Sequence, residues 1–202
     1  MLDLASAFGI PSTRDGGRAA WPVTPRAQGQ STFSGRSGPA GFHTDAQYRA
    51  NPEDYVCLFA VRPAADGGGS TLLLPFHAAL EAIRERRDGG MLLAAMQRPG
   101  WRWRVPAESA DGPHCAFPAS VLDGCGRIRW RADNLDALPT GAPAGAAGRI
   151  DEAFDAADGR VRLHLKGGDL LVLDNHRVLH APTDFRDRRR LLLRVRLWET
   201  LY

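Results

Sequence analysis

Short apolar runs separated by glycine and proline divide the chain into predicted strands. Residues 55–61 form a mixed apolar run that predicts a buried strand, and Arg62-Pro63 closes it. Residues 71–74 form a second run, directly after a glycine-rich loop at 66–70. Further strands are predicted at 101–105, 127–131, 161–166, 170–174 and 191–198, with a tight turn at 167–169.

Helical spacing is confined to two regions of the chain. Pro75 can begin a helix whose apolar residues fall on one stripe, and residues 91–97 can continue it after the glycines at 89 and 90. A short helix is predicted at 149–157. Many strands with only a few helices predict a mainly β fold, arranged as a double-layer jelly roll.

The last predicted strand has two distinct faces. One face is apolar, and the other carries Arg190, Leu192, Arg194, Arg196 and Trp198. An ordinary surface strand would carry polar residues of both signs, so cations that point into an interior cavity explain the pattern better. The strand therefore predicts a cavity lined by arginine.

Length and composition favour one compact unit. At 202 residues the chain is predicted to be a single domain, residues 1–202. Residues 1–41 are predicted to be its loop-rich N-terminal segment, because glycine, proline, serine, threonine and arginine crowd residues 11–41.

Charge and cysteine usage exclude several classes of protein. The formal net charge is +3, but the positive residues are scattered along the chain, which does not indicate nucleic-acid binding. Three cysteines without a Cys-x-x-Cys pair argue against a disulfide framework and for a reducing compartment. No signal peptide is visible and no run approaches the ~18 apolar residues of a membrane span. A soluble, cytoplasmic protein without a membrane partner is expected.

Two histidines and one aspartate are the residue types that hold ferrous iron on one face of an octahedron. His43 and Asp45 stand two apart, so in an extended chain both side chains leave the same side and can converge on one ion. His180, which follows the apolar run at 170–173, supplies the third ligand. Such a triad leaves three positions open for a bidentate co-substrate and for oxygen. The alternative is that the histidines are core residues and Asp45 caps a turn.

Four short motifs occur together in one order along the chain. They are His-Thr-Asp at 43–45, Gly-Gly-Ser-Thr at 68–71, Asp-Asn-His-Arg-Val-Leu-His at 174–180 and Arg-Arg-Leu-Leu-Leu-Arg at 189–194. In this combination the chain resembles the taurine dioxygenase (TauD/TfdA-like) family of Fe(II)- and 2-oxoglutarate-dependent dioxygenases. The resemblance implies a double-stranded β-helix, or jelly roll, of the clavaminate synthase-like type.

The resemblance also implies roles for individual residues. The iron ligands and catalytic residues would be His43, Asp45 and His180. Thr71 and Arg190 would bind the distal carboxylate of 2-oxoglutarate, the arginine through a paired, charge-assisted contact. Arg189 is the competitor for this role if the register slips by one residue, although the alternation of the strand favours Arg190.

Substrate contacts are expected beside the metal. Arg194 lies four residues beyond Arg190 on the same strand face, and in the family this second arginine commonly holds an acidic group. The alternative is an internal ion pair with a nearby aspartate, such as Asp169, Asp174 or Asp184. Gln47 and Tyr48, which follow Asp45 closely, are also predicted to contact the substrate.

The implied activity is an oxygenase that uses Fe(II), 2-oxoglutarate and O2 to hydroxylate, desaturate or cyclise a small acidic substrate, with release of succinate and CO2. The aspartate at position 45 argues against halogenation, because related halogenases have a small residue there. The alternative is a non-catalytic, cupin-like small-molecule-binding protein, which would lack a ligand or the co-substrate arginine. A metal-dependent hydrolase is a weaker alternative, because no general base is evident.

One departure from the family concerns the N-terminal portion. Only residues 1–42 precede His43, whereas members usually have a longer segment that contributes to the substrate pocket. We therefore expect a pocket that is more open, or one that a second copy completes in a homo-oligomer.

Two further features are interpreted as structural. Asn175 is expected to brace the chain before His180. In the alternating run at 101–104, Trp101 and Trp103 are expected to pack inward from a strand rather than line a substrate cavity.

Overall fold

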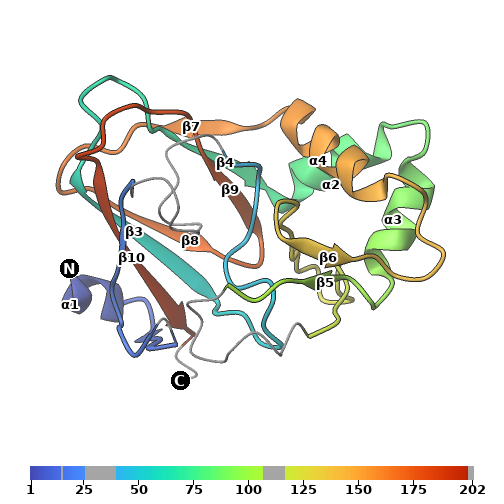
Figure 1. The fold of residues 1–202 in the computed structure, drawn as a ribbon, viewed down its shortest axis with the longest axis horizontal. Helices are drawn as coiled ribbons and strands as arrows, with labels where there is room; N and C mark the ends of the chain where they lie inside the picture. The colour runs from blue at the N-terminus through green and yellow to red at the C-terminus, as the bar shows by residue number, and fades with distance from the viewer. Residues whose placement is uncertain (15, 26–39, 107–116, 200–202) are drawn as a thin grey trace.

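A computed structural model of the chain describes all residues except 15, 26–39, 107–116 and 200–202. The strands are β1 (Ile10–Pro11), β2 (Trp21–Val23), β3 (Tyr55–Arg62), β4 (Thr71–Pro75), β5 (Arg102–Trp103), β6 (Leu135–Ala137), β7 (Val161–Leu163), β8 (Leu170–Asp174), β9 (Val178–Pro182) and β10 (Leu191–Trp198). The helices are α1 (Leu2–Ser6), α2 (Phe76–Arg84), α3 (Gly89–Gln97) and α4 (Ala146–Ala156). Figure 1 shows their arrangement.

The larger sheet is antiparallel and is built around the two longest strands. Its order is β1-β10-β3-β8, and β2 pairs with the same strand β10. Strand β3 has a buried residue on both faces, including Val56 and Cys57, which explains its continuous apolar sequence. The outer face packs Cys57, Val195 and Leu197 against Ala5 of α1. The inner face packs Val56, Leu58 and Leu173 toward the second sheet.

The smaller sheet has the order β7-β4-β9. Leu73 of β4 and Val178 of β9 pack against the inner face of the larger sheet, so the two sheets form facing layers. The opposite face of the smaller sheet carries Leu74 and Leu179, which join the main core. This arrangement leaves the inner faces of both sheets available to line one site.

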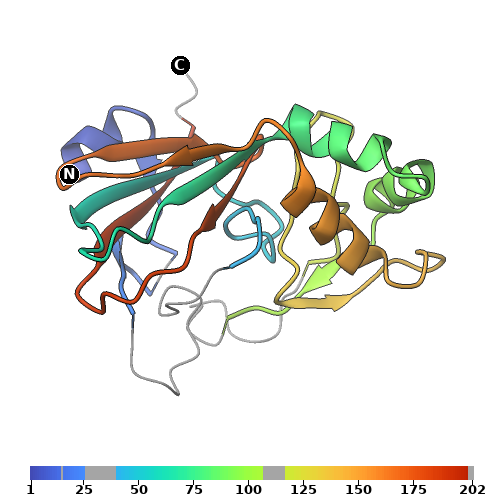
Figure 2. The same ribbon diagram turned by 90° about the horizontal axis from the view of Figure 1, so that it is seen from above.

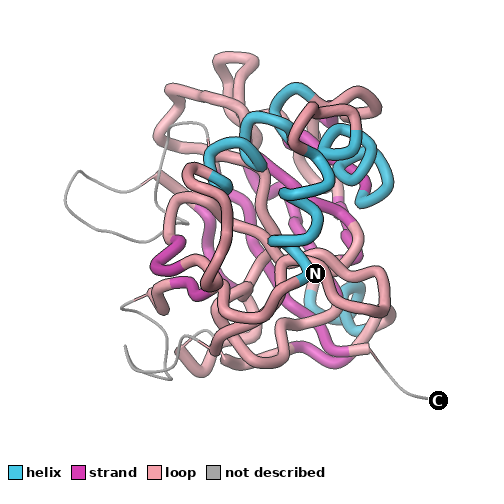
Figure 3. The backbone as a smooth tube through the Cα atoms, turned by 90° about the vertical axis from the view of Figure 1, so that its right-hand side faces the viewer, coloured by secondary structure: helices cyan, strands magenta, loops and turns pink. Residues whose placement is uncertain are grey.

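The helices α2, α3 and α4 gather at one end of the molecule, away from the larger sheet (Figures 1 and 2). The tube in Figure 3 shows the same grouping from the side. Their apolar residues enclose three fully buried tryptophans, Trp101, Trp103 and Trp130. Trp101 and Trp103 donate indole N–H bonds to the carbonyls of Ala95 and Arg131. The prediction that both tryptophans of the 101–104 run pack inward is confirmed.

The mainly β prediction is confirmed, and the clearest apolar patterns match strands. Residues 55–61, 170–174 and 191–198 lie in β3, β8 and β10. The helix after Pro75 forms as predicted, whereas α3 is a separate helix that begins at Gly89. The helix predicted at 149–157 begins three residues earlier, as α4. Strand β9 was not predicted, because its five residues include a histidine and a proline.

Other expectations require correction. Of residues 101–105 only Arg102–Trp103 form a strand, and residues 127–131 form none. Ile128 makes a single bridge to Leu122, and Trp130 pairs with the ligand-bearing loop instead of with a neighbouring strand. The segment predicted to be loop-rich, residues 1–41, contains the short elements α1, β1 and β2, and its residues 15 and 26–39 lie outside the described part of the chain.

The structure also bears on the cysteines and on membrane-spanning helices. Cys57 and Cys125 are free thiols, and Cys115 lies outside the described residues. Within the described ranges, no helix is long and apolar enough to cross a membrane.

Candidate metal centre

The two histidines of the predicted triad face each other on paired backbone. His43 donates its N–H to the carbonyl of His180, and His180 donates its N–H to the carbonyl of His43, at 3.0 and 2.9 Å. This isolated antiparallel bridge places the loop before Asp45 directly against β9. The rings lie 4.3 Å apart, centroid to centroid. The backbone itself therefore sets the spacing of the two imidazoles.

Asp45 reaches the histidines from a turn, not from the extended strand that the spacing predicted. Ala46, the next residue, has a φ of 54°, a left-handed conformation that is rare for a residue other than glycine. Asn175 holds the aspartate peptide on both sides. Its side-chain oxygen accepts the Asp45 N–H at 2.7 Å, and its amide nitrogen donates to the Asp45 carbonyl at 3.1 Å. The predicted bracing role of Asn175 is thus directed at Asp45.

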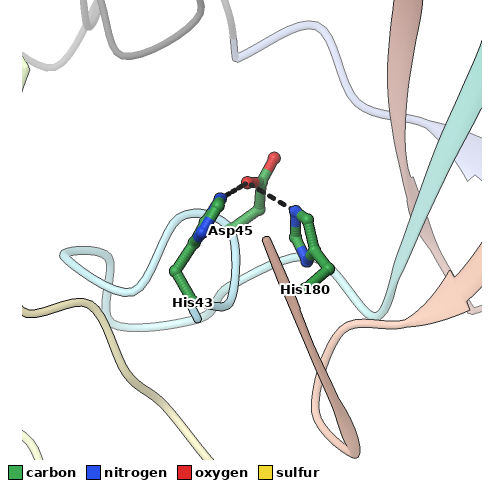
Figure 4. Close-up of side chains that lie close together, drawn as sticks. All are labelled: His43, Asp45 and His180. Carbon is green, nitrogen blue, oxygen red and sulfur yellow. Dashed lines mark ion pairs between the residues drawn. The ribbon is translucent and has the colours of Figure 1, made fainter. Parts of the chain in front are cut away.

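The three side chains converge on a small volume (Figure 4). Asp45 Oδ1 lies 4.0 Å from His43 Nε2 and 3.8 Å from His180 Nε2. One ligand atom from each residue lies within 4.8 Å of the other two, and all three residues are buried. Two nitrogens and one oxygen at these separations match the donor set of a facial triad.

The protonation states favour metal binding. Burial and the nearby Arg131 lower the pKa of His43 well below its ordinary value. Burial also lowers the pKa of His180, against the opposing effect of Asp45. For Asp45, burial by itself would raise the pKa, but Arg194 and other nearby positive charges outweigh it and hold the pKa far below its usual range. Neutral imidazoles beside an ionised carboxylate are the forms that bind a metal.

The remaining polar atoms also fit a metal ion. His43 Nδ1 lies 3.0 Å from the Gly41 carbonyl, which favours a proton on Nδ1 and leaves the Nε2 lone pair for a ligand. The atoms that face one another are the Nε2 nitrogens of the two histidines and Oδ1 of Asp45, so two neutral imidazoles and one carboxylate are directed at the same point. This is the donor set that a facial triad offers to Fe(II). The residues present therefore fit Fe(II).

Arg194 lies against the far oxygen of the aspartate. Its Nη1 is 3.0 Å from Asp45 Oδ2, an ion pair without hydrogen-bond alignment. Oδ1 faces the two histidines, so the two carboxylate oxygens have different neighbours. Of the two readings of Arg194, the internal ion pair is present in the structure, but its partner is Asp45 and not one of the three aspartates suggested by the sequence.

A cavity between the two sheets contains the triad. The larger sheet contributes Leu58, Leu192 and Arg194, and the smaller sheet contributes Thr71 and His180. Thr71 begins β4, is buried, and lies one strand away from β9, which carries His180. The glycine-rich loop thus delivers the threonine to the cavity wall, as predicted.

The structure distinguishes clearly between the two candidate arginines. Arg190 is 4% exposed and lines the cavity, whereas Arg189 has a 73% exposed side chain paired with Asp187. The guanidinium of Arg190 stacks on Phe185 at 4.5 Å and contacts the carbonyl of Gly69. Gly69 has a φ of 70°, and a Cβ there would lie 2.9 Å from Arg190 Nε, so both the turn and the close approach require glycine.

Burial also favours the binding of an anion by Arg190. Desolvation lowers the pKa of Arg190, and no carboxylate among the described residues counteracts this effect. A buried cation without a counter-ion is destabilising. Arg190 therefore has the environment of a residue that receives a charged ligand.

The structure does not bring Gln47 and Tyr48 into the cavity. Gln47 is buried and donates to Asn134 Oδ1 at 2.8 Å, and Tyr48 packs in the main core. Neither is among the described residues that line the cavity. The turn after Asp45, closed by a hydrogen bond from Arg49 to Ala46, directs both side chains away from the metal ligands. The sequence expectation for these two residues is corrected accordingly.

Arg131 is a cavity residue that sequence reasoning missed. It was assigned only to a short predicted strand at 127–131. Its position depends on the pairing of Trp130 with Thr44, a contact between distant parts of the chain. No local pattern reports such a contact.

Comparison with models of protein families shows which family the chain belongs to. The model of the family described as "Taurine catabolism dioxygenase TauD, TfdA family" matches residues 1–196. The chain belongs to the TauD/TfdA family. The predicted family membership is confirmed, and the four motifs lie within the matched range.

Solved structures support the same fold for this TauD/TfdA member. An asparagine oxygenase in complex with Fe(II), 2S,3S-3-hydroxyasparagine and succinate is 22% identical, with a TM-score of 0.76 over 95% of this chain and 60% of that one. The non-heme iron oxygenase OrfP, in complex with Fe and α-ketoglutaric acid, is 19% identical, with a TM-score of 0.70 over 99% and 64%. The chain thus spans less than two thirds of the length of these proteins. The jelly-roll prediction is confirmed.

Proposed function

We propose that the protein is an Fe(II)- and 2-oxoglutarate-dependent oxygenase that hydroxylates a small acidic molecule, or desaturates or cyclises it. The observation that carries the proposal is the convergence of His43, Asp45 and His180 in a cavity that also contains Arg190 and Thr71. Family membership supports it. The iron and 2-oxoglutarate named for the solved relatives agree with this donor set.

The residues of the chain would divide the work between binding and orientation. His43, Asp45 and His180 would hold the iron, which with 2-oxoglutarate and O2 supplies the oxidising chemistry and yields succinate and CO2. Arg190 would bind the distal carboxylate of 2-oxoglutarate through its guanidinium, and Thr71 would donate its hydroxyl to the same group. Because Thr71 and Arg190 are buried, these contacts would form in a setting of low dielectric constant, which strengthens them.

Arg194 would serve as the anchor for an acidic group of the substrate. It lines the cavity four residues beyond Arg190, and its Nη1 lies 3.0 Å from Asp45 Oδ2. A substrate acid bound there would lie next to the iron ligands. A neutral ester or amide of the substrate should therefore be turned over far less efficiently, and Arg194→Met should narrow that difference.

The metal assignment is tested by metal content. Wild type should bind one Fe(II) per chain in anaerobic equilibrium dialysis, and His180→Ala and His43→Ala should lose most of it, because each removes one of three ligands. His77→Ala removes an exposed histidine outside the cavity and serves as the matched control. Stoichiometric iron in both ligand variants would refute the site.

The co-substrate assignment is tested by a pair of adjacent arginines. Arg190→Gln should raise the 2-oxoglutarate concentration for half-saturation on the order of a hundredfold, because it removes a buried, charge-assisted contact. Arg189→Gln is the matched control and should leave half-saturation unchanged, since that side chain is exposed. The reverse result would mean that the register of the last strand is off by one. A protein that binds 2-oxoglutarate but never consumes it would instead be a binding protein.

A further inference from the structure

Phe185 lies in the cavity wall beside the arginine that we assign to the co-substrate. It follows β9, is 5% exposed and lines the cavity together with Arg190. The guanidinium carbon of Arg190 lies over the ring of Phe185, 4.5 Å from its centroid. At this distance the π-face of the ring attracts the cation, and the attraction is stronger where both groups are shielded from water. Phe185 and Arg190 therefore form one contacting pair inside the cavity.

The backbone on either side of Phe185 is bonded to the glycine-rich loop. On one side, Gly69 donates its N–H to the carbonyl of Asp184 at 3.1 Å. On the other side, the carboxylate of Asp66 accepts the N–H of Arg186. Because hydrogen bonds hold the chain before and after it, the ring of Phe185 stands at a fixed place relative to the cavity.

The contact with the ring is compatible with the binding of a carboxylate by Arg190. The ring attracts the delocalised charge of the guanidinium, whereas a carboxylate accepts from its N–H donors, so both contacts can be made at once. Among the described residues, these side-chain donors make one hydrogen bond, from Nη2 to the carbonyl of Gly69 at 3.5 Å. Phe185 can therefore restrict the movement of the guanidinium without competing for its donors.

A fixed cation opposite a fixed metal ion selects the length of the co-substrate. A 2-oxo diacid would reach the metal with its keto end and Arg190 with its distal carboxylate, so the separation of the two sites must match the number of methylenes between those groups. An arginine side chain that nothing restrains has considerable rotamer freedom, which would let the cation follow a longer ligand. A restrained guanidinium has lost this freedom before the ligand arrives, which also strengthens binding.

We propose that Phe185 is a positioning residue, which holds the guanidinium of Arg190 in one place and thereby makes the cavity select 2-oxoglutarate over 2-oxoadipate, the diacid with one more methylene. This inference rests on the proposed oxygenase function and deepens it. The other reading is that Phe185 only fills space in the cavity wall, where Pro182 and Leu192 are further apolar residues. A filling role requires apolar volume but no aromatic face.

The experiment measures binding without turnover. Protein loaded with Zn(II) is titrated by calorimetry with 2-oxoglutarate and, separately, with 2-oxoadipate. Wild type should bind 2-oxoglutarate about tenfold or more tighter, because the surplus methylene does not fit between two fixed sites. In Phe185→Leu and Phe185→Met, which keep apolar volume, 2-oxoglutarate affinity should fall about fivefold and the preference should shrink to about threefold or less. The affinity for Zn(II) should stay unchanged in both variants, which also shows that they are folded.

A double-mutant cycle separates positioning from filling. In an Arg190→Gln background, Phe185→Leu should change 2-oxoglutarate affinity by less than about twofold, because the cation that the ring positions is gone. Phe117→Leu alters a phenylalanine that is 51% exposed and lies outside this cavity, and should have no effect. A wild type without the preference, unchanged binding in both single variants of Phe185, or an equal loss in both backgrounds overturns the inference. A wild type that binds neither Zn(II) nor 2-oxoglutarate refutes the proposed function instead.

Discussion

At the scale of single residues, Asn175 connects three parts of the site. Besides its two bonds to the Asp45 peptide, its amide nitrogen donates to the Glu53 carbonyl at 2.8 Å. It is 1% exposed, so water cannot replace these partners. The left-handed backbone at Ala46 leaves the Asp45 peptide in a conformation that needs such support. Asn175 is therefore expected to position a metal ligand without touching the metal.

Replacing Asn175 should weaken metal binding. Asn175→Ala removes both bonds to the Asp45 peptide, and Asn175→Asp keeps an acceptor for the N–H but loses the donor to two carbonyls. Each variant should lower metal affinity about 10- to 100-fold, the range typical of outer-shell partners. Affinity is measured by competition with a chelating dye, and the exposed Asn51→Ala is the control. Wild-type metal affinity in both Asn175 variants would show that the hydrogen bonds between Asn175 and the Asp45 peptide are not needed for metal binding.

The site residues differ in how far the sequence could predict them. His43, Asp45 and His180 are recognisable because their chemistry and motifs are local, and the alternation of the last strand correctly placed Arg190 and Arg194 on one face. Arg131 could not be found in this way, because its place depends on one pairing between Trp130 and Thr44. Gln47 and Tyr48 were predicted to contact the substrate because they lie close to Asp45 in the sequence. The turn after Asp45 instead directs both side chains away from the cavity.

At the scale of elements, a buried charge network ties the N-terminal segment to β10. Glu53, whose side chain is fully buried, accepts from the Ser12 hydroxyl at 2.7 Å and from Arg14 Nε at 3.1 Å. Its other oxygen lies 3.5 Å from Arg196 Nη1 on β10. Ser12 also donates its N–H to the Arg196 carbonyl. Because β10 carries Arg194, this network indirectly fixes one wall of the cavity.

Glu53 should make stability depend on pH in the acid range. Burial by itself would raise the pKa of Glu53, but Arg196 and Arg14 outweigh it, so the folded pKa lies below the ordinary value of 4.5. The stabilisation is therefore present above pH 4.5 and is lost as the pH falls through the lowered folded value. Glu53→Gln should cost about 3 kcal/mol at neutral pH, because it removes the buried carboxylate that faces Arg196 and Arg14.

Urea unfolding at several pH values tests this expectation. The difference in unfolding free energy between wild type and Glu53→Gln should shrink as the pH falls from 4.5 through the lowered folded pKa, because Glu53 of the unfolded wild type takes up its proton first. Glu81→Gln alters an exposed ion pair with Arg84 and should cost less than about 1 kcal/mol at any pH. A difference that stays constant with pH would mean that Glu53 contributes through packing and not through its charge.

The elements also differ in predictability. Strands β3, β8 and β10 were predictable because each contains a run of apolar residues, and many of these residues are buried or half-buried in the folded protein. Strand β9 was not, because its strand character comes from pairing with β4. The 127–131 segment has a strand-like composition but bonds to loops, so tertiary contacts overrode its local preference.

At the scale of the whole molecule, the ligands come from parts of the chain that meet only in the folded state. The bridge between His43 and His180 requires the 43–45 loop to lie against β9, and β9 in turn to pair with β4. In the unfolded chain, bringing His180 to His43 and Asp45 would cost the conformational entropy of closing a long loop. The binding site is consequently a product of folding.

This has a consequence for how the protein matures. We expect the bridge that joins the histidines to form after the transition state of folding, because it joins residues far apart in the sequence. Refolding from urea should then proceed at the same rate with Zn(II) or with EDTA, whereas bound metal should slow unfolding. His180→Ala should abolish the slowing, and faster refolding with metal would contradict the order. Stopped-flow fluorescence of the buried tryptophans provides the signal. The metal ion would then bind to a protein that has already folded and would slow its unfolding. A cell could load, lose and replace iron without refolding the protein.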